Sequence, residues 1–164
     1  MVRAARPEDV PAIYRLIREL ADYEHSLDKV TGTEQDLRRS LFGADPAVYA
    51  HVATDDDGEV VGFALWFLNY STWTGTHGIY LEDLFVEPGT RGRGYGKALL
   101  TELARICVER GYARLEWAVL DWNTPSIEFY QALGARAMDE WDIYRLTGPA
   151  LAALGSARET RTRP

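Results

Sequence analysis

Three glycines alternate with larger residues in the segment Arg91-Gly92-Arg93-Gly94-Tyr95-Gly96-Lys97. This segment lies between an apolar run that ends at Val86 and a run of helical periodicity that begins at Lys97. Glycine lets the backbone approach an anion closely, and the unpaired amides of a first helical turn favour a phosphate. The segment is therefore a candidate cradle for a diphosphate. The alternative is a flexible glycine-rich loop whose basic side chains serve solubility.

Two common phosphate motifs do not fit this segment. A Walker A loop with its lysine at position 97 would need a glycine at position 91 and a serine or threonine at position 98. The chain has Arg91 and Ala98 at those positions. A dinucleotide fingerprint that began at Gly92 would place its third glycine at Lys97. ATP hydrolysis and NAD binding are therefore both disfavoured.

A second group of polar residues follows the strand that we expect at Arg114–Leu120. Asn123 comes just after this strand, and Ser126 and Tyr130 share one face of the helix that follows. The phenol of Tyr130 can be a general acid, because a tyrosine of ordinary pKa, ~10, is protonated at neutral pH. The alternative is a half-buried helix tyrosine that only packs.

The residues of both segments resemble those of the GNAT superfamily of N-acetyltransferases. Arg91–Gly96 resembles its acetyl-CoA loop, and Asp121–Tyr130 with Leu133–Ala135 resembles the terminal motif of its polyamine-type members. The resemblance implies that acetyl-CoA is the cofactor and that loop amides hold its diphosphate. It also implies that the strand ending at Val86 pairs with the pantetheine arm and that Tyr130 is the general acid. The implied cofactor-binding residues are Leu84, Phe85, Val86, Arg91, Gly92, Arg93, Gly94, Tyr95, Gly96, Lys97, Asn123, Ser126 and Tyr130.

Three further segments resemble one branch of this superfamily. Leu16–Glu24, Tyr70–Trp73 and Tyr80–Asp83 are similar to segments of diamine (spermidine/spermine) acetyltransferases and thialysine N-epsilon-acetyltransferases. The likeness implies that the acceptor is a small cationic amine. The reacting nitrogen of such an amine must lose a proton to water or to a carboxylate, and Glu82 is the candidate carboxylate for this catalytic role. The implied substrate-binding residues are Tyr23, Glu24, Trp73, Glu82 and Asp83.

Glu82 and Asp83 are adjacent, so in a regular strand their side chains would point to opposite faces of the sheet. Both can line one cleft only if the strand contains a bulge or the sheet opens at this point. Of the two, we favour Glu82 as the functional carboxylate. The alternative for the pair is an ion pair at the end of a strand.

The residue type at position 71 bears on the choice of acceptor. The polyamine-preferring branch tends to carry an acidic residue there, whereas Ser71-Thr72 before Trp73 resembles the thialysine branch. A short amine with a nearby carboxylate, such as a lysine analogue, is therefore a candidate acceptor beside the diamines and polyamines.

Hydrophobic periodicity predicts an α/β fold with a mixed central sheet and helices on both faces, and the resemblance makes this sheet GNAT-type. The expected strands are Val2–Ala5, Tyr49–Ala53, Glu59–Tyr70, Gly78–Val86, Arg114–Leu120 and Asp142–Leu146. The expected helices are one that begins at about Pro7–Asp9 and ends near Tyr23–His25, then Thr31 or Thr33 to Leu41, Lys97–Arg110, Ser126–Leu133 and Ala150–Leu154. With 164 residues, we expect a single acetyltransferase domain at residues 1–148 and a peripheral tail at 149–164.

Bulk properties narrow the partners. A formal net charge of -7 and a pI near 5.0 argue against nucleic acid as a partner. No apolar stretch reaches the ~18 residues of a membrane span, and Cys107 is the single cysteine. His25, His51 and His77 lack the spacing of metal ligands. We therefore expect a cytoplasmic protein with no metal and no membrane contact, and the resemblance adds a homodimer.

The leading hypothesis is direct transfer of acetyl from acetyl-CoA to a primary amine within a ternary complex. No acyl-enzyme is expected, because Cys107 is not placed to be a nucleophile. One rival is the same chemistry on a protein or antibiotic amine. The other is a module of the same fold that binds acyl-CoA without turnover.

Overall fold

The computed structural model describes residues 1–156, and these residues form two compact units. The first unit is Met1–Ala118, and the second begins at Val119. The expected single domain at residues 1–148 stays a prediction.

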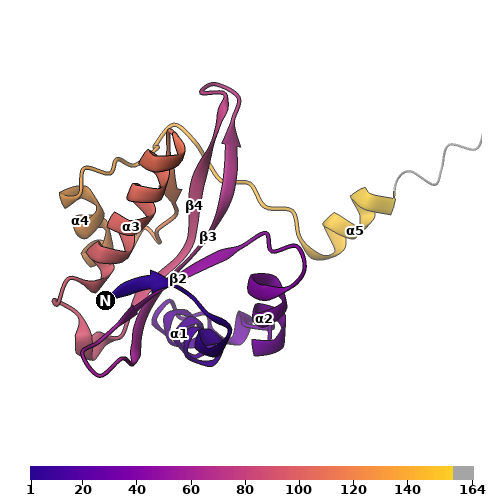
Figure 1. Ribbon diagram of the computed structural model, residues 1–164. Coiled ribbons are helices and arrows are strands. Elements are labelled where there is room, and N and C mark those ends of the chain that lie inside the picture. The colour runs from indigo at the N-terminus through magenta and orange to yellow at the C-terminus, as the bar shows by residue number, and fades with distance from the viewer. Residues whose placement is uncertain (157–164) are drawn as a thin grey trace, which may run out of the picture. The chain divides into compact units, whose positions relative to one another are not determined.

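A mixed five-stranded sheet forms the centre of the first unit (Figure 1). The strands, whose order in the sheet is their order in the chain, are β1 (Val2–Ala4), β2 (Tyr49–Thr54), β3 (Val60–Ser71), β4 (Thr76–Val86) and β5 (Leu115–Trp117). The first four strands pair antiparallel, and β5 pairs parallel to β4. β5 is shorter than the expected strand Arg114–Leu120, because only three of its residues pair with β4. The predicted mixed sheet is confirmed.

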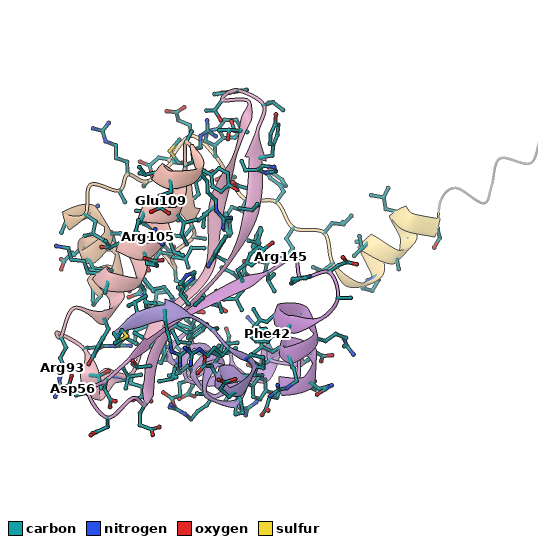
Figure 2. All side chains as sticks on the ribbon, viewed as in Figure 1. Phe42, Asp56, Arg93, Arg105, Glu109 and Arg145 are labelled. Carbon is teal, nitrogen blue, oxygen red and sulfur yellow. The ribbon has the colours of Figure 1, made fainter. Side chains whose placement is uncertain are left out.

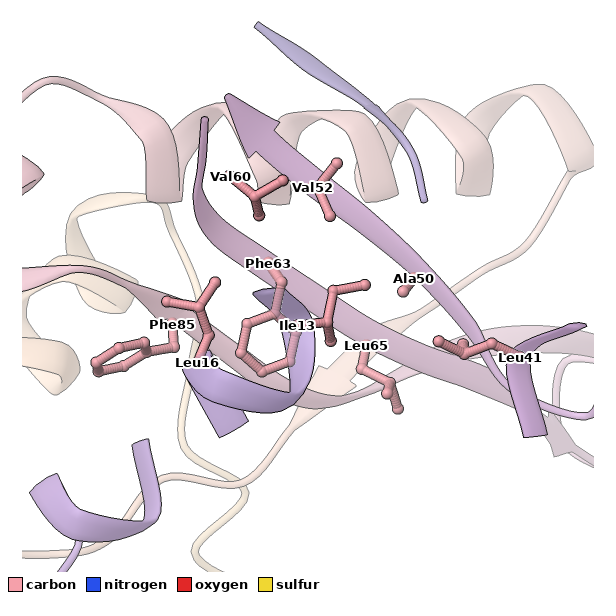
Figure 3. Close-up of a cluster of buried hydrophobic side chains, with 9 residues drawn as sticks. All are labelled: Ile13, Leu16, Leu41, Ala50, Val52, Val60, Phe63, Leu65 and Phe85. Carbon is pink, nitrogen blue, oxygen red and sulfur yellow. The ribbon is translucent and has the colours of Figure 1, made fainter. Parts of the chain in front are cut away.

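Helices cover both faces of this sheet, as expected. α1 (Val10–Tyr23) and α2 (Glu34–Phe42) pack on one face, where they share an apolar cluster with the strands (Figure 3). α3 (Tyr95–Arg110) packs on the other face. The cluster under α1 and α2 consists of Ile13, Leu16, Leu41, Ala50, Val52, Val60, Phe63, Leu65 and Phe85. Short 3-10 turns occupy Pro7–Asp9 (η1), Leu27–Lys29 (η2) and Pro88–Thr90 (η3).

The second unit contains α4 (Thr124–Ala132) and α5 (Gly148–Ser156), and α5 includes the helix expected at Ala150–Leu154. The strand expected at Asp142–Leu146 does not form, so that prediction is wrong. Periodicity alone does not create a strand, because its backbone groups need a neighbouring strand to bond.

Part of the expected tail, residues 157–164, lies outside the described residues. Across residues 1–156, no helix combines the length and the apolar character needed to cross a membrane.

Asp9 joins the first strand to the first helix. The residue is only 5% exposed, and its carboxylate accepts hydrogen bonds from Arg3 Nη1 at 2.6 Å and Arg3 Nη2 at 2.9 Å. The same carboxylate accepts a bond from the backbone N–H of Arg6 at 2.7 Å. The hydrogen bonds from Arg3 outweigh burial and lower the pKa of Asp9. The ionised carboxylate is therefore part of the folded structure.

The substitution Asp9→Asn should lower the free energy of unfolding by about 2 kcal/mol at neutral pH, because it removes a charge-assisted pair. A carboxyl whose pKa is lowered by folding stabilises the protein above its unfolded pKa, and this contribution is lost as pH falls through the folded pKa. The difference between variant and parent should therefore shrink below about pH 4. Urea unfolding at neutral and acidic pH measures it. The exposed Asp56→Asn is the control, and equal losses in both variants would contradict the prediction.

Candidate active site

A β-bulge places Glu82 and Asp83 in the middle of the sheet. Leu65 of β3 lies opposite Asp83, but the next residue, Trp66, lies opposite Leu81, so Glu82 is the extra residue on β4. A bulge changes the direction of the side chains around it. The structure thus contains the irregularity that the sequence required if both carboxylates were to serve one site.

Three carboxylates from two elements interact at this bulge. Burial is the main cause that raises the pKa of Asp83 to about 7, and the negative charges of Glu82 and Glu24 add to it. Glu24 directly follows α1, and burial raises its pKa as well. Glu82 is the exposed member of the group. The acidic cluster of Glu24, Glu82 and Asp83 can therefore bind a cation and also exchange a proton near neutral pH.

The end of α1 also contacts the start of the glycine-rich loop. The Arg91 guanidinium carbon lies 5.2 Å from the centroid of the Tyr23 ring and 5.5 Å from that of Phe85. Arg91 Nε donates a hydrogen bond to the carbonyl oxygen of Val86 at 3.1 Å. The Arg91 side chain therefore has three contacts with its own protein. A direct contact of Arg91 with a cofactor stays a prediction.

The glycine-rich loop has the backbone geometry of an anion cradle. Gly92 and Gly94 have φ of +83° and +84°, a conformation that favours glycine. α3 begins immediately afterwards, and its first turn is closed by the bond from Ala98 N to Gly94 O at 2.9 Å. The amides of residues 95–97 come before this bond, at the positive end of the helix dipole. The exposed side chains of Arg93, labelled in Figure 2, and Lys97 add positive charge.

The edge of β4 beyond the bulge has room for an extended partner. β5 pairs with β4 only at Ile79–Leu81, so within the first unit it leaves the last residues of β4 unpaired on that side. Glu87 N donates a hydrogen bond to Val61 O at 2.9 Å. Along an antiparallel strand, residues whose backbone groups bond the partner alternate with residues whose backbone groups point away from it. The backbone groups of Leu84 and Val86 therefore point away from β3. Leu84 and Val86 therefore fit the predicted pairing with a pantetheine arm. Phe85 turns its backbone toward β3 and its side chain into the core.

The downstream site residues lie in the second unit. Asn123 immediately precedes α4 and its carbonyl accepts a bond from Ile127 N at 3.0 Å. Ser126 and Tyr130 lie four residues apart on α4, and the Tyr130 ring is 5.4 Å from that of Phe129. The roles of Asn123, Ser126 and Tyr130 stay predictions.

Trp73 lies at the turn between β3 and β4 and is 81% exposed. The strand from Thr76 to Glu82 spans roughly 20 Å. Within the first unit, the structure therefore does not bring Trp73 to the acidic cluster. Its contact with a substrate stays a prediction.

The structure also contains a polar group around the buried side chain of His51, which we did not predict from the sequence. His51 Nδ1 accepts a hydrogen bond from Trp66 Nε1 at 3.1 Å, and His51 Nε2 lies 3.8 Å from Glu102 Oε1. Burial lowers the pKa of His51. These residues line a cleft of about 450 Å³ that none of the predicted site residues lines. Residues 1–156 contain no group of three side chains that could hold a metal ion.

The comparison with known proteins identifies the class. The chain matches the model of the acetyltransferase (GNAT) family over residues 11–135, and it belongs to that family. A thialysine N-epsilon-acetyltransferase from Bos taurus is 40% identical, and the match covers 94% of this chain and 96% of that protein. The L-ornithine N5-acetyltransferase NATA1 from Arabidopsis thaliana is 34% identical, with 93% and 86% covered. The solved structure of an integron cassette protein from V. cholerae superposes with a TM-score of 0.79 at 28% identity, covering 95% of this chain and 97% of that one.

Proposed function

We propose that this GNAT-family acetyltransferase moves the acetyl group of acetyl-CoA to a primary amine of a small cationic acceptor. The observation that carries the proposal is the acidic cluster at the bulge of β4, in which burial and the charges of Glu82 and Glu24 raise the pKa of Asp83 to about 7. A group with a pKa near the working pH is suited to general base catalysis. The cluster lies at the bulge of β4, the strand that leads into the anion cradle.

Acetyl-CoA fits the residues that lie between the bulge and α3. The amides of the loop and the charges of Arg93 and Lys97 would hold its diphosphate. The free edge of β4 at Leu84 and Val86 would pair with its pantetheine arm. Asn123, Ser126 and Tyr130 would complete the cofactor contacts, as the family resemblance implies.

Transfer requires three proton movements. The acceptor ammonium loses a proton to the pair of Glu82 and Asp83, and the lone pair of the resulting amine forms the new N–C bond. The C–S bond of the thioester breaks, and the departing thiolate takes a proton from the hydroxyl of Tyr130. The new amide nitrogen releases its extra proton to water, from which the Tyr130 oxygen is reprotonated.

No acyl-enzyme is part of the proposal. Cys107 is buried on α3, and burial raises the pKa of its thiol, which disfavours the reactive thiolate. Its Sγ donates to the carbonyl oxygen of Arg114 at 3.7 Å. The acceptor amine would therefore attack the thioester directly. One buried, free cysteine also suits a reducing cytoplasm.

The acceptor class is a diamine in the broad sense, with or without a carboxylate. Two similar proteins are named for thialysine and ornithine, which are amino acids with a terminal amine. Ser71 in place of an acid supports a short acceptor over a long polyamine. The acidic cluster would hold one ammonium while the other amine reacts.

A homodimer is part of the same proposal. Tyr70 and Trp73, at the turn between β3 and β4, are 59% and 81% exposed. Large exposed aromatic side chains mark sites of association. Sedimentation equilibrium tests this point, and a monomer at high protein concentration would contradict it.

A panel of amines tests the acceptor class through the release of free thiol from acetyl-CoA. The panel comprises thialysine, ornithine, lysine, a diamine, spermidine, an aminoglycoside and a peptide with a free N-terminus. We expect kcat/KM to be highest for a short diamino compound. Acetylation of the peptide or the aminoglycoside alone would contradict the proposal.

A further inference from the structure

The side chain of Arg91 connects α1, which ends beside the acidic cluster, to the loop of the anion cradle. Tyr23 is the last residue of α1, and Phe85 is near the end of β4. Arg91 precedes the first glycine of the loop, and its guanidinium lies over both rings, at 5.2 and 5.5 Å from their centroids. The bond from Arg91 Nε to Val86 O fixes the same side chain to β4.

This arrangement depends on the shape of arginine as well as its charge. A planar guanidinium can stack on an aromatic face while its Nε–H points to a carbonyl. Lysine has the charge but neither the plane nor the Nε–H. The two aromatic contacts therefore make the position of Arg91, and with it the start of the loop, depend on Tyr23.

The residue after Tyr23 interacts with the acidic cluster. The charge of Glu24 raises the pKa of Asp83. Of these two adjacent residues, Tyr23 therefore contacts the loop through Arg91, and Glu24 interacts with the acidic cluster. Any ligand that fixes this dipeptide also fixes Arg91. Two sites that bias the same element are energetically coupled, and the coupling is reciprocal.

We propose that Arg91 is a positioning residue, which orders the coenzyme A loop through Tyr23 and so couples the amine site to the affinity for coenzyme A. The inference rests on the proposed function for the identity of both ligands. It assigns to Tyr23 an effect on coenzyme A that a residue of the amine site alone would not have.

Calorimetric titration with coenzyme A alone, without any amine, tests the proposal. Tyr23→Leu and Arg91→Lys should each weaken coenzyme A binding ~3-fold, as expected for the loss of a partly exposed cation–π contact. Tyr23→Phe keeps the ring and should bind like the parent protein. The double variant Tyr23→Leu/Arg91→Lys should be no weaker than Arg91→Lys alone, because Arg91→Lys already removes the contact with Tyr23.

Hydrogen exchange of the amides of residues 92–97 gives a second readout. These amides should exchange faster in Tyr23→Leu than in Tyr23→Phe, even without coenzyme A, while amides in the middle of α3 should be unaffected. An unchanged Kd in Tyr23→Leu, or additive losses in the double variant, would overturn the proposal. If the parent protein does not bind coenzyme A, the proposed function fails, and the exchange result still decides whether Tyr23 positions the loop.

Discussion

Replacing Tyr130 with phenylalanine should lower kcat about 100-fold, because a general acid typically contributes at least that factor. The substitution keeps the ring and its contact with Phe129, so α4 should be unchanged. It removes only the hydroxyl that would protonate the leaving thiolate. Since that proton moves only during the reaction, KM should change much less than kcat.

The measurement is steady-state kinetics in which acetyl-CoA is varied at a saturating concentration of the best amine of the panel. Tyr144→Phe is a matched control, because this tyrosine also lies in the second unit and is 94% exposed. It should leave kcat unchanged. An unaltered kcat in Tyr130→Phe would remove Tyr130 from the acid role, and a rise in KM for acetyl-CoA with unchanged kcat would assign it to cofactor binding alone.

Replacing Asp83 with asparagine should lower kcat/KM about 100-fold at neutral pH, since the substitution removes a candidate general base. In the parent protein, activity should rise with pH through about 7, as the carboxyl loses its proton. That limb of the pH profile should be absent in Asp83→Asn. The exposed Asp56→Asn should keep both the rate and the profile. A full profile retained in Asp83→Asn would contradict the assignment.

The carboxylates near Asp83 allow a test of the direction in which its pKa is shifted. The charges of Glu82 and Glu24 disfavour the ionised form of Asp83 and raise its pKa, so neutralising either one should lower that pKa. The acidic limb should therefore move to lower pH in Glu82→Gln and in Glu24→Gln. Glu82→Gln should also lose activity if Glu82 shares the proton. A limb that moves to higher pH in either variant would mean that the three carboxylates do not interact as described.

Asp83 also has a consequence for stability. Its pKa is higher in the folded protein than in the unfolded chain, so the fold favours the protonated form. Stability should therefore fall as pH rises from about 4 through about 7, where the folded protein must ionise a partly buried carboxyl. Asp83→Asn, although nearly inactive, should unfold at a higher temperature than the parent at alkaline pH. This combination is typical of a functional residue that is retained at a cost to stability.

The features that the sequence predicts well are local ones. The amphipathic helix α1 and the strands β2, β3 and β4 follow from spacing within a few turns or residues, and the structure places them close to the expected limits. The glycine-rich loop before α3 is local in the same sense. Its backbone conformation is set by glycines that lie two residues apart in sequence, as φ at Gly92 and Gly94 shows.

The features that the sequence did not determine depend on pairs that are distant in sequence. The sequence left a bulge at Glu82 and Asp83 as one of two conditions for a shared cleft, and the bulge itself arises from the register of β3 against β4, which no local pattern encodes. The raised pKa of Asp83 depends in part on Glu24, on a different element, so the sequence alone favoured Glu82. The contact of Arg91 with Tyr23 is likewise between distant residues. The strand expected at Asp142–Leu146 failed for the same reason, because its periodicity gives no pairing partner.

The central claim is catalysed transfer of acetyl from acetyl-CoA to an amine, and the most direct test is a mass balance. Purified protein is incubated with acetyl-CoA and the best amine of the panel, and both products are quantified by mass spectrometry. We predict equal amounts of free coenzyme A and N-acetylated amine, with no acetyl group on the protein after acetyl-CoA alone. Binding of acetyl-CoA without turnover, or release of thiol without acetylated amine, would contradict the account.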